Sequence, residues 1–85
     1  MADEVLVKMY SRRMCHLCEE ARDVIAAEAR RTPFRFEEVF IDGDDGLERA
    51  YGIRVPVVEV DGVERFEYRV DPGEFRRRVH PGEPG

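Results

Sequence analysis

The residues best suited to do chemistry are Cys15 and Cys18, two thiols separated by two residues. They follow a short apolar segment and stand where an amphipathic helix is expected to begin. At that position, free backbone N–H groups and the positive end of the helix dipole favour a thiolate over a thiol. Spacing, preceding strand and following helix together predict a thiol–disulfide redox site.

The two thiols are expected to have different roles. Cys15, at the helix start and nearer solvent, is the predicted nucleophile. Cys18, one turn further in, should be more buried and should attack the mixed disulfide formed on Cys15. Arg13 and His16 are expected to modulate the site through their positive potential. Both Arg12 and Arg13 could equally be simple loop charges, and His16 a solvent-exposed modulator or a proton shuttle.

Composition excludes several classes of protein. The chain has 85 residues and a net charge of −5, with basic and acidic residues interleaved, which argues against nucleic acid as a partner. No stretch approaches the roughly 18 apolar residues that span a bilayer. The acidic start, Met1–Glu4, does not resemble a signal peptide, so a cytoplasmic location is expected. In a reducing compartment, such a cysteine pair is expected to be catalytic or metal-binding rather than structural.

The elements that must position these cysteines follow from periodicity and turn residues. Strands are expected at 5–10, 34–41, 55–60 and 63–68, and helices at 16–31, 45–51 and 72–79. Asp61 and Gly62 form a strong hairpin signal. Asp44 and Asp71 are expected helix caps, and Gly52 is expected to end the second helix in a left-handed conformation.

This β-α-β-α-β-β-α order predicts a four-stranded mixed α/β sheet with helices on both faces. The first two strands should be parallel with a right-handed crossover, and the closing hairpin antiparallel. Residues 1–80 are expected to form a single domain and 81–85 a flexible C-terminal tail. His80 is expected to be a frayed end without a role, and Met14 to pack within its loop.

The element order, with Cys15-His-Leu-Cys18 after the first strand and Val55-Pro56 before the third, resembles the thioredoxin fold. Within that fold it is most similar to the glutaredoxin-like small thiol oxidoreductases. The resemblance implies that Pro56 follows a cis peptide bond and lies against the cysteines. The backbone at Val55 and Pro56 would then bind substrate as an added strand would.

One segment departs from the glutaredoxin pattern. Glutathione-using glutaredoxins carry a Gly-Gly pair after the hairpin, followed by acidic residues that hold the γ-glutamyl end of glutathione. Here 65–69 read Arg-Phe-Glu-Tyr-Arg. Arg12 matches a position where glutaredoxins place a lysine for the glycine carboxylate, so it is the candidate substrate-binding cation. No resident cofactor or metal is expected, and glutathione is only a candidate co-substrate.

The resemblance and the cysteine pair predict a cytosolic dithiol–disulfide oxidoreductase. It would act as a monomer on protein or low-molecular-weight disulfides, with glutathione, an unidentified reductase or another thiol as donor. Two alternatives stay open. The cysteines could bind a metal ion, with His16 or His80 as a third ligand, or an iron–sulfur cluster shared between chains. The disulfide could instead switch binding to a partner protein.

Overall fold

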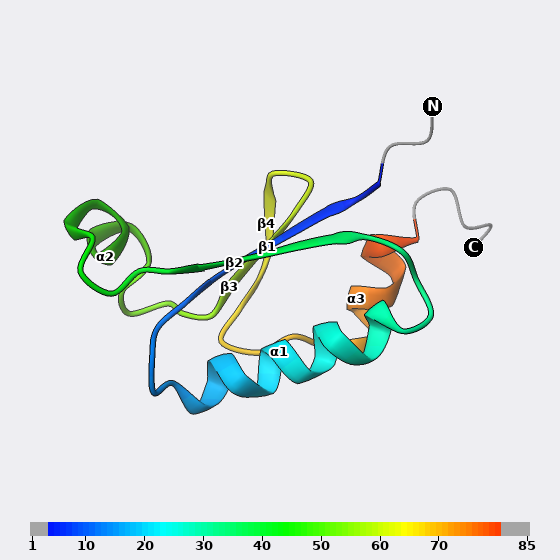
Figure 1. The fold of residues 1–85 in the computed structure, drawn as a ribbon, viewed down its shortest axis with the longest axis horizontal. Helices are drawn as coiled ribbons and strands as arrows, with labels where there is room; N and C mark the ends of the chain where they lie inside the picture. The colour runs from blue at the N-terminus through cyan, green and yellow to red at the C-terminus, as the bar shows by residue number, and fades with distance from the viewer. Residues whose placement is uncertain (1–3, 81–85) are drawn as a thin grey trace.

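The structure, a computed structural model, describes residues 4–80 (Figure 1). Its elements are β1 (Leu6–Ser11), α1 (His16–Ala29), β2 (Arg35–Phe40), α2 (Asp45–Tyr51), β3 (Val57–Val60), β4 (Val63–Glu67) and α3 (Pro72–Val79). The expected order is confirmed, with boundaries that differ from the expected ones by no more than two residues. The tail predicted at 81–85 lies outside the described residues.

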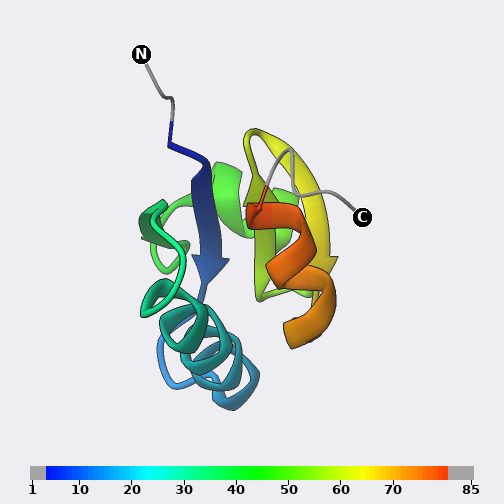
Figure 2. The same cartoon turned by 90° about the vertical axis from the view of Figure 1, so that its right-hand side faces the viewer.

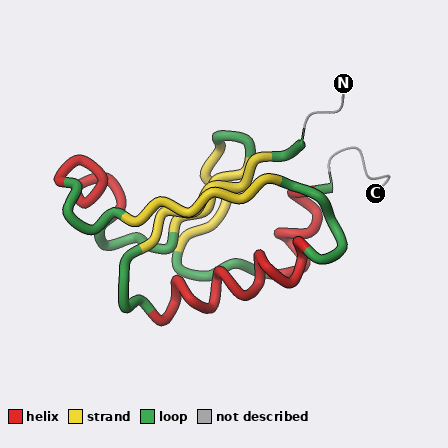
Figure 3. Tube along the Cα trace, in the orientation of Figure 1, coloured by secondary structure: helices red, strands yellow, loops and turns green. Residues whose placement is uncertain are grey.

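The four strands form one sheet in the order β2-β1-β3-β4. β1 and β2 are parallel, whereas β3 runs antiparallel to both β1 and β4. Figure 3 shows α1 and α3 on the same side of this sheet, and Figure 2 shows the two helices side by side. α2 lies at one end of the sheet, where Tyr51 stacks on Tyr10 with ring centroids 4.0 Å apart. Because Tyr10 points away from α1, helices contact both faces, but α2 covers only the end of its face.

The core lies between the sheet and the pair α1 and α3. Its buried side chains come from β1, β3 and both helices: Val7, Met9, Val58, Val60, Ala21, Ile25, Phe75 and Val79. Phe75 is completely buried and contacts the rings of Phe34 and Phe66, with centroids 5.7 and 6.2 Å away. The core fixes α1 on one face of the sheet, and the cysteines lie at the start of α1, just after the end of β1.

Local hydrogen bonds explain where the shorter elements begin. Asp44 accepts the N–H of Leu47 at 2.9 Å and caps α2, and Asp71 accepts the N–H of Glu74 at 2.8 Å and caps α3. The hairpin between β3 and β4 turns at Asp61–Gly62, where both residues have positive φ, +51° and +84°. The predicted caps and hairpin are therefore confirmed.

The predicted left-handed conformation of Gly52 is wrong. Gly52 has φ −47° and continues the helical turn, with its N–H donating to the carbonyl of Glu48 at 2.8 Å. A Cβ at this position would collide with that same carbonyl oxygen, so close packing rather than a positive φ requires glycine here.

The prediction that His80 has no role is also wrong. Its Nε2 atom lies 2.6 Å from the hydroxyl of Thr32 and 3.3 Å from Oε2 of Glu28. Glu28 is buried although it is charged, so it needs polar partners, and α3 brings His80 to it. His80 therefore joins α3 to the end of α1.

Candidate functional site

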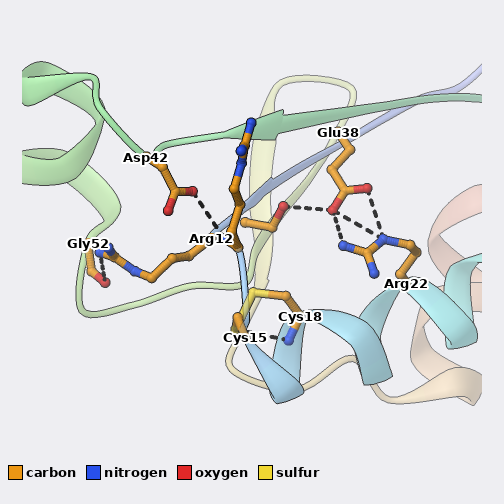
Figure 4. The surroundings of a disulfide bond; sticks show 9 residues. Arg12, Cys15, Cys18, Arg22, Glu38, Asp42 and Gly52 are labelled. Atoms are coloured by element: carbon orange, nitrogen blue, oxygen red, sulfur yellow. Dashed lines mark hydrogen bonds and ion pairs between the residues drawn. A yellow bond between two sulfur atoms is a disulfide. The ribbon is translucent and has the colours of Figure 1, made fainter.

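Cys15 is the N-cap residue of α1, and Cys18 lies in the first turn of that helix (Figure 4). The backbone of Cys15 is extended, and its Sγ atom accepts the N–H of Cys18 at 3.2 Å. The two sulfur atoms form a disulfide, with the Cα atoms 5.2 Å apart. Cys18 is fully buried and Cys15 is half-buried, which is the order of exposure expected from the sequence.

The two sulfur atoms differ in their exposure to solvent and in their electrostatic surroundings. Only Cys15 can be reached from solvent, and it sits where the N–H groups and the dipole of α1 stabilise negative charge. In the reduced protein those same groups would favour a thiolate on Cys15. Cys18 faces the core and can be reached only by its neighbour, so the pair suits sequential attack on one external disulfide.

The proline loop lies at the same end of the sheet. β3 is antiparallel to β1, and its first residue, Val57, pairs with Tyr10 near the end of β1. The loop before β3 therefore meets the loop that carries Cys15. The peptide bond between Val55 and Pro56 is cis, Pro56 is buried, and Val55 is half-buried.

Arg12 turns toward α2. Its Nη2 atom lies 2.7 Å from Oε1 of Glu48 and donates to the carbonyl of Gly52 at 3.1 Å. These contacts connect three parts of the site, namely the loop before α1, α2 and the segment that leads to the proline loop. The contacts support a positioning role for Arg12, since its guanidinium is occupied within the protein.

Arg13 and His16 lie at the surface of the site. The backbone N–H of Arg13 donates to Oδ1 of Asp42 at 3.0 Å, and its guanidinium lies 5.9 Å from the centroid of the Phe40 ring. The side chain of His16 is 82% exposed, and its Nε2 atom is 2.9 Å from Oε2 of Glu20. When His16 is protonated, this carboxylate offsets part of its charge, which weakens the modulation of Cys15 expected from the sequence.

Three exposed apolar side chains come from the loops at this end of the molecule. Met14 is 100% exposed, Ile53 is 89% exposed and Tyr68 is 44% exposed. The prediction that Met14 packs within its loop is wrong, because its backbone is left-handed, with φ +54°, and the side chain is left in solvent. Ile53 was missed entirely, although an isolated apolar residue in a loop outside any periodic pattern is a usable signal.

A polar network also lies close to the cysteines and was missed as part of the site. Glu38 of β2 accepts the hydroxyl of Ser11 at 2.7 Å and forms an ion pair with Arg22, which follows Cys18 by one turn of α1 (Figure 4). Burial raises the pKa of Glu38, but hydrogen bonds from Arg22 and Ser11 outweigh it and hold the pKa below its ordinary value. In the sequence, Glu38 only interrupts an apolar strand face; the network explains why a charge is tolerated there.

The metal hypothesis loses His80, one of its two proposed third ligands; His16 remains next to Cys15 in the sequence. His80 contacts Glu28 near the far end of α1, and a helix of 14 residues is about 20 Å long. Within residues 4–80, no three histidine, cysteine or acidic side chains are grouped so as to hold a metal ion. In the same range, no helix has the length and apolar character needed to cross a membrane.

The sheet order, the cysteine pair at the start of α1 and the adjacent proline loop define a protein of the thioredoxin fold. The sequence profile described as Glutaredoxin-like domain (DUF836) matches residues 6–80, so the chain belongs to the glutaredoxin-like family. No functionally curated protein matches the chain significantly.

Solved structures of similar proteins share the fold of this chain. Protein XcR50 from X. campestris is 40% identical, with a TM-score of 0.69 and coverage of 84% of this chain and 91% of that one. Protein Ne2328 from Nitrosomonas europaea is 28% identical, with a TM-score of 0.78 and coverage of 93% and 95%. A mutant thioredoxin from Halobacterium salinarum NRC-1 shares the fold at 23% identity, with a TM-score of 0.62 and coverage of 91% and 73%.

Proposed function

We propose that this protein is a dithiol–disulfide oxidoreductase that works through Cys15 and Cys18. One observation carries the proposal: the half-buried Sγ of Cys15 caps α1 and accepts a helix N–H, while Cys18 is sealed beneath it. Membership of the glutaredoxin-like family supports the same chemistry.

The reaction follows from this arrangement. The thiolate of Cys15 attacks one sulfur of a substrate disulfide, forms a mixed disulfide and expels the other sulfur as a thiolate that takes up a proton. The thiol of Cys18 then loses its proton and attacks Sγ of Cys15. The mixed disulfide breaks, the second substrate thiolate leaves, and the protein ends in the Cys15–Cys18 disulfide. Two electrons have passed from the protein to the substrate.

The cycle needs a donor that returns the two electrons. A dithiol reductase, or two molecules of a low-molecular-weight thiol, would attack the disulfide at Cys15, the exposed sulfur. We place this activity in the cytoplasm, where such donors keep thiols reduced, and assign it to the monomer.

Replacement of each cysteine tests the proposal. Cys15→Ser should abolish turnover of a peptide disulfide, because the attacking sulfur is lost. Cys18→Ser should instead accumulate a covalent mixed disulfide with the substrate, because the second attack cannot occur. Mass spectrometry of the intact protein distinguishes the two results.

The same variants provide the control. In reduced Cys18→Ser, alkylation of Cys15 should reach half its maximal rate at a pH below the value of about 8.5 that is typical of a free thiol. Full activity of both serine variants on peptide disulfides would contradict the proposal, as would a Cys15 that does not react with the alkylating reagent.

A further inference from the structure

A groove of about 430 Å³ lies between α1 and the segment that joins β4 to α3. Its lining includes Leu17, which stands between the two cysteines in the sequence. Most of the lining is apolar, including Val24 of α1 and, from the opposite side, Phe66 and Val70. The volume lies within the range of small-ligand sites, so the groove can receive a side chain or a small molecule.

Tyr68 forms a wall of this groove and is fastened to the proline loop at two points. Its N–H donates to the carbonyl of Pro56 at 2.9 Å, and its hydroxyl donates to the carbonyl of Ile53 at 3.2 Å. Its φ of +68° is unusual for a residue other than glycine. Tyr68 therefore lines the groove while its N–H and hydroxyl are both hydrogen-bonded to the backbone on either side of Val55.

The charges of the groove disfavour an anionic ligand. Its lining includes the carboxylates of Glu20 and Asp71 but only one cation, Arg69. Arg69 already lies 3.6 Å from Glu20, across the groove from its own segment. A ligand with several carboxylates would have to break this pair and would then meet the two acidic side chains.

The other cations close to the proline loop are also engaged. Arg12 pairs with Glu48, and Arg54 pairs with Glu64 and Glu67. Arg13, at the surface of the site, has its guanidinium 5.9 Å from the centroid of the Phe40 ring. The groove and the surroundings of the proline loop thus offer mostly apolar surface and paired charges. That chemistry complements an uncharged apolar side chain better than it complements a small anionic thiol.

We propose that Tyr68 and Arg69 determine the substrate class of this protein. The preferred substrates are polypeptide disulfides in which an apolar residue flanks the cysteine and enters the groove. Small, carboxylate-rich disulfides such as glutathione disulfide are disfavoured. The proposal rests on the oxidoreductase function proposed above and adds its specificity.

Three disulfide substrates test the specificity. Two are peptide disulfides that differ only in the residue flanking the cysteine, leucine in one and aspartate in the other; the third is glutathione disulfide. The wild-type protein should reduce the leucine peptide with a kcat/KM about tenfold higher than the aspartate peptide, and glutathione disulfide more slowly still. Glycine tolerates the positive φ at this position, so Tyr68→Gly should fold; it should lose most of the leucine preference.

Two further variants separate the contributions. Tyr68→Phe keeps the ring and should keep the preference. Arg69→Ala removes the only arginine of the lining, which pairs with Glu20, so it should disfavour the aspartate peptide further. Arg65→Ala, which replaces an exposed arginine of β4 outside this lining, should change none of the ratios.

The outcomes distinguish the two proposals. Wild-type protein that reduces no disulfide at all would overturn the oxidoreductase function itself. Equal reduction of the leucine and aspartate peptides, a preference for glutathione disulfide, or unchanged ratios in Tyr68→Gly would overturn only the specificity proposed here.

Discussion

The two ends of α1, the long helix below the sheet in Figure 1, differ in how their polar and apolar groups are used. At the first end, a half-buried sulfur caps the helix, and apolar side chains such as Met14 and Ile53 stand in solvent. At the other end, the charged Glu28 is buried among partners from the segment that follows α1 and from the end of the chain that carries α3. The first end keeps its groups available to a ligand, whereas the second satisfies them within the protein. The reactive cysteine and the buried charge cluster around Glu28 thus lie at opposite ends of α1.

At the C-terminal end of α1, the carboxylate of Glu28 is the shared partner of several polar side chains. Glu28 accepts the hydroxyl of Thr32 at 2.6 Å and lies 3.2 Å from Nε of Arg76, beside His80 and Arg31. Burial raises the pKa of Glu28, but hydrogen bonds from Thr32, Arg76 and His80 outweigh burial and hold the pKa below its ordinary value. The charge therefore stabilises the contact between α1 and α3.

The largest effect on stability is expected from Glu28→Gln. Glutamine keeps the shape and the contact with Thr32 but removes the negative charge that faces Arg76 and His80. The free energy of unfolding, measured with urea at neutral pH, should fall by about 1–3 kcal/mol. Turnover at Cys15, at the other end of the helix, should change little in the protein that remains folded.

Acid should remove the same stabilisation from the wild-type protein. The folded-state pKa of Glu28 is lowered, so its contribution is complete above the ordinary value of 4.5 and is lost as pH falls through the folded-state pKa. The difference in stability between wild type and Glu28→Gln should therefore shrink below that pH. A difference that stayed constant into acid would show that the charge of Glu28 contributes nothing.

A smaller loss of stability is expected from Arg12→Met, because the ion pair with Glu48 is half-exposed. Unfolding should become easier by about 1 kcal/mol. Turnover should fall by about tenfold, since the loops that carry Cys15 and Pro56 lose a shared anchor. This variant tests the contrast between the two ends of α1, because it breaks a stabilising contact at the end that carries Cys15.

Glu48→Gln distinguishes two roles for Arg12, namely positioning the loops of the site and binding a substrate carboxylate. If Arg12 positions the loops, weakening its partner should lower kcat for neutral and anionic substrates alike. If Arg12 instead binds a substrate carboxylate, Glu48→Gln should leave kcat intact and Arg12→Met should raise KM for anionic substrates only.

The smallest effect is a gain in stability from Met14→Gly. Methionine at φ +54° costs conformational energy, and its fully exposed side chain contributes no packing in return. Glycine should raise the free energy of unfolding by about 0.5–1 kcal/mol, as measured by urea titration. A loss of stability would mean that Met14 makes contacts in solution that hold the loop, and would weaken the contrast between the two ends.

Local sequence signals were sufficient for most of the fold. Asp44 and Asp71 cap helices through their own side chains, and Asp61–Gly62 turns the hairpin through its own backbone preferences. Each of these signals acts within a few residues of the chain. For the same reason, the cysteine pair could be placed at a helix start before the structure was known.

The features that were missed depend on contacts distant in sequence. The guanidinium of Arg12 donates to a carbonyl 40 residues later in the chain, and His80 reaches Glu28, 52 residues earlier. Glu38 looks misplaced in its strand until α1 brings Arg22 over it. No local propensity encodes such partners, so the sequence predicted the position of the cysteines but not the network around them.

Tyr68 links two parts of the molecule that a substrate would touch at the same time. Tyr68 lines the groove, and its N–H and hydroxyl donate hydrogen bonds to carbonyls on both sides of Val55. A side chain that enters the groove would therefore contact a residue that is hydrogen-bonded to the main chain on both sides of Val55. The fit of a substrate side chain in the groove and the alignment of the substrate disulfide with Cys15 would then depend on the same residue, Tyr68.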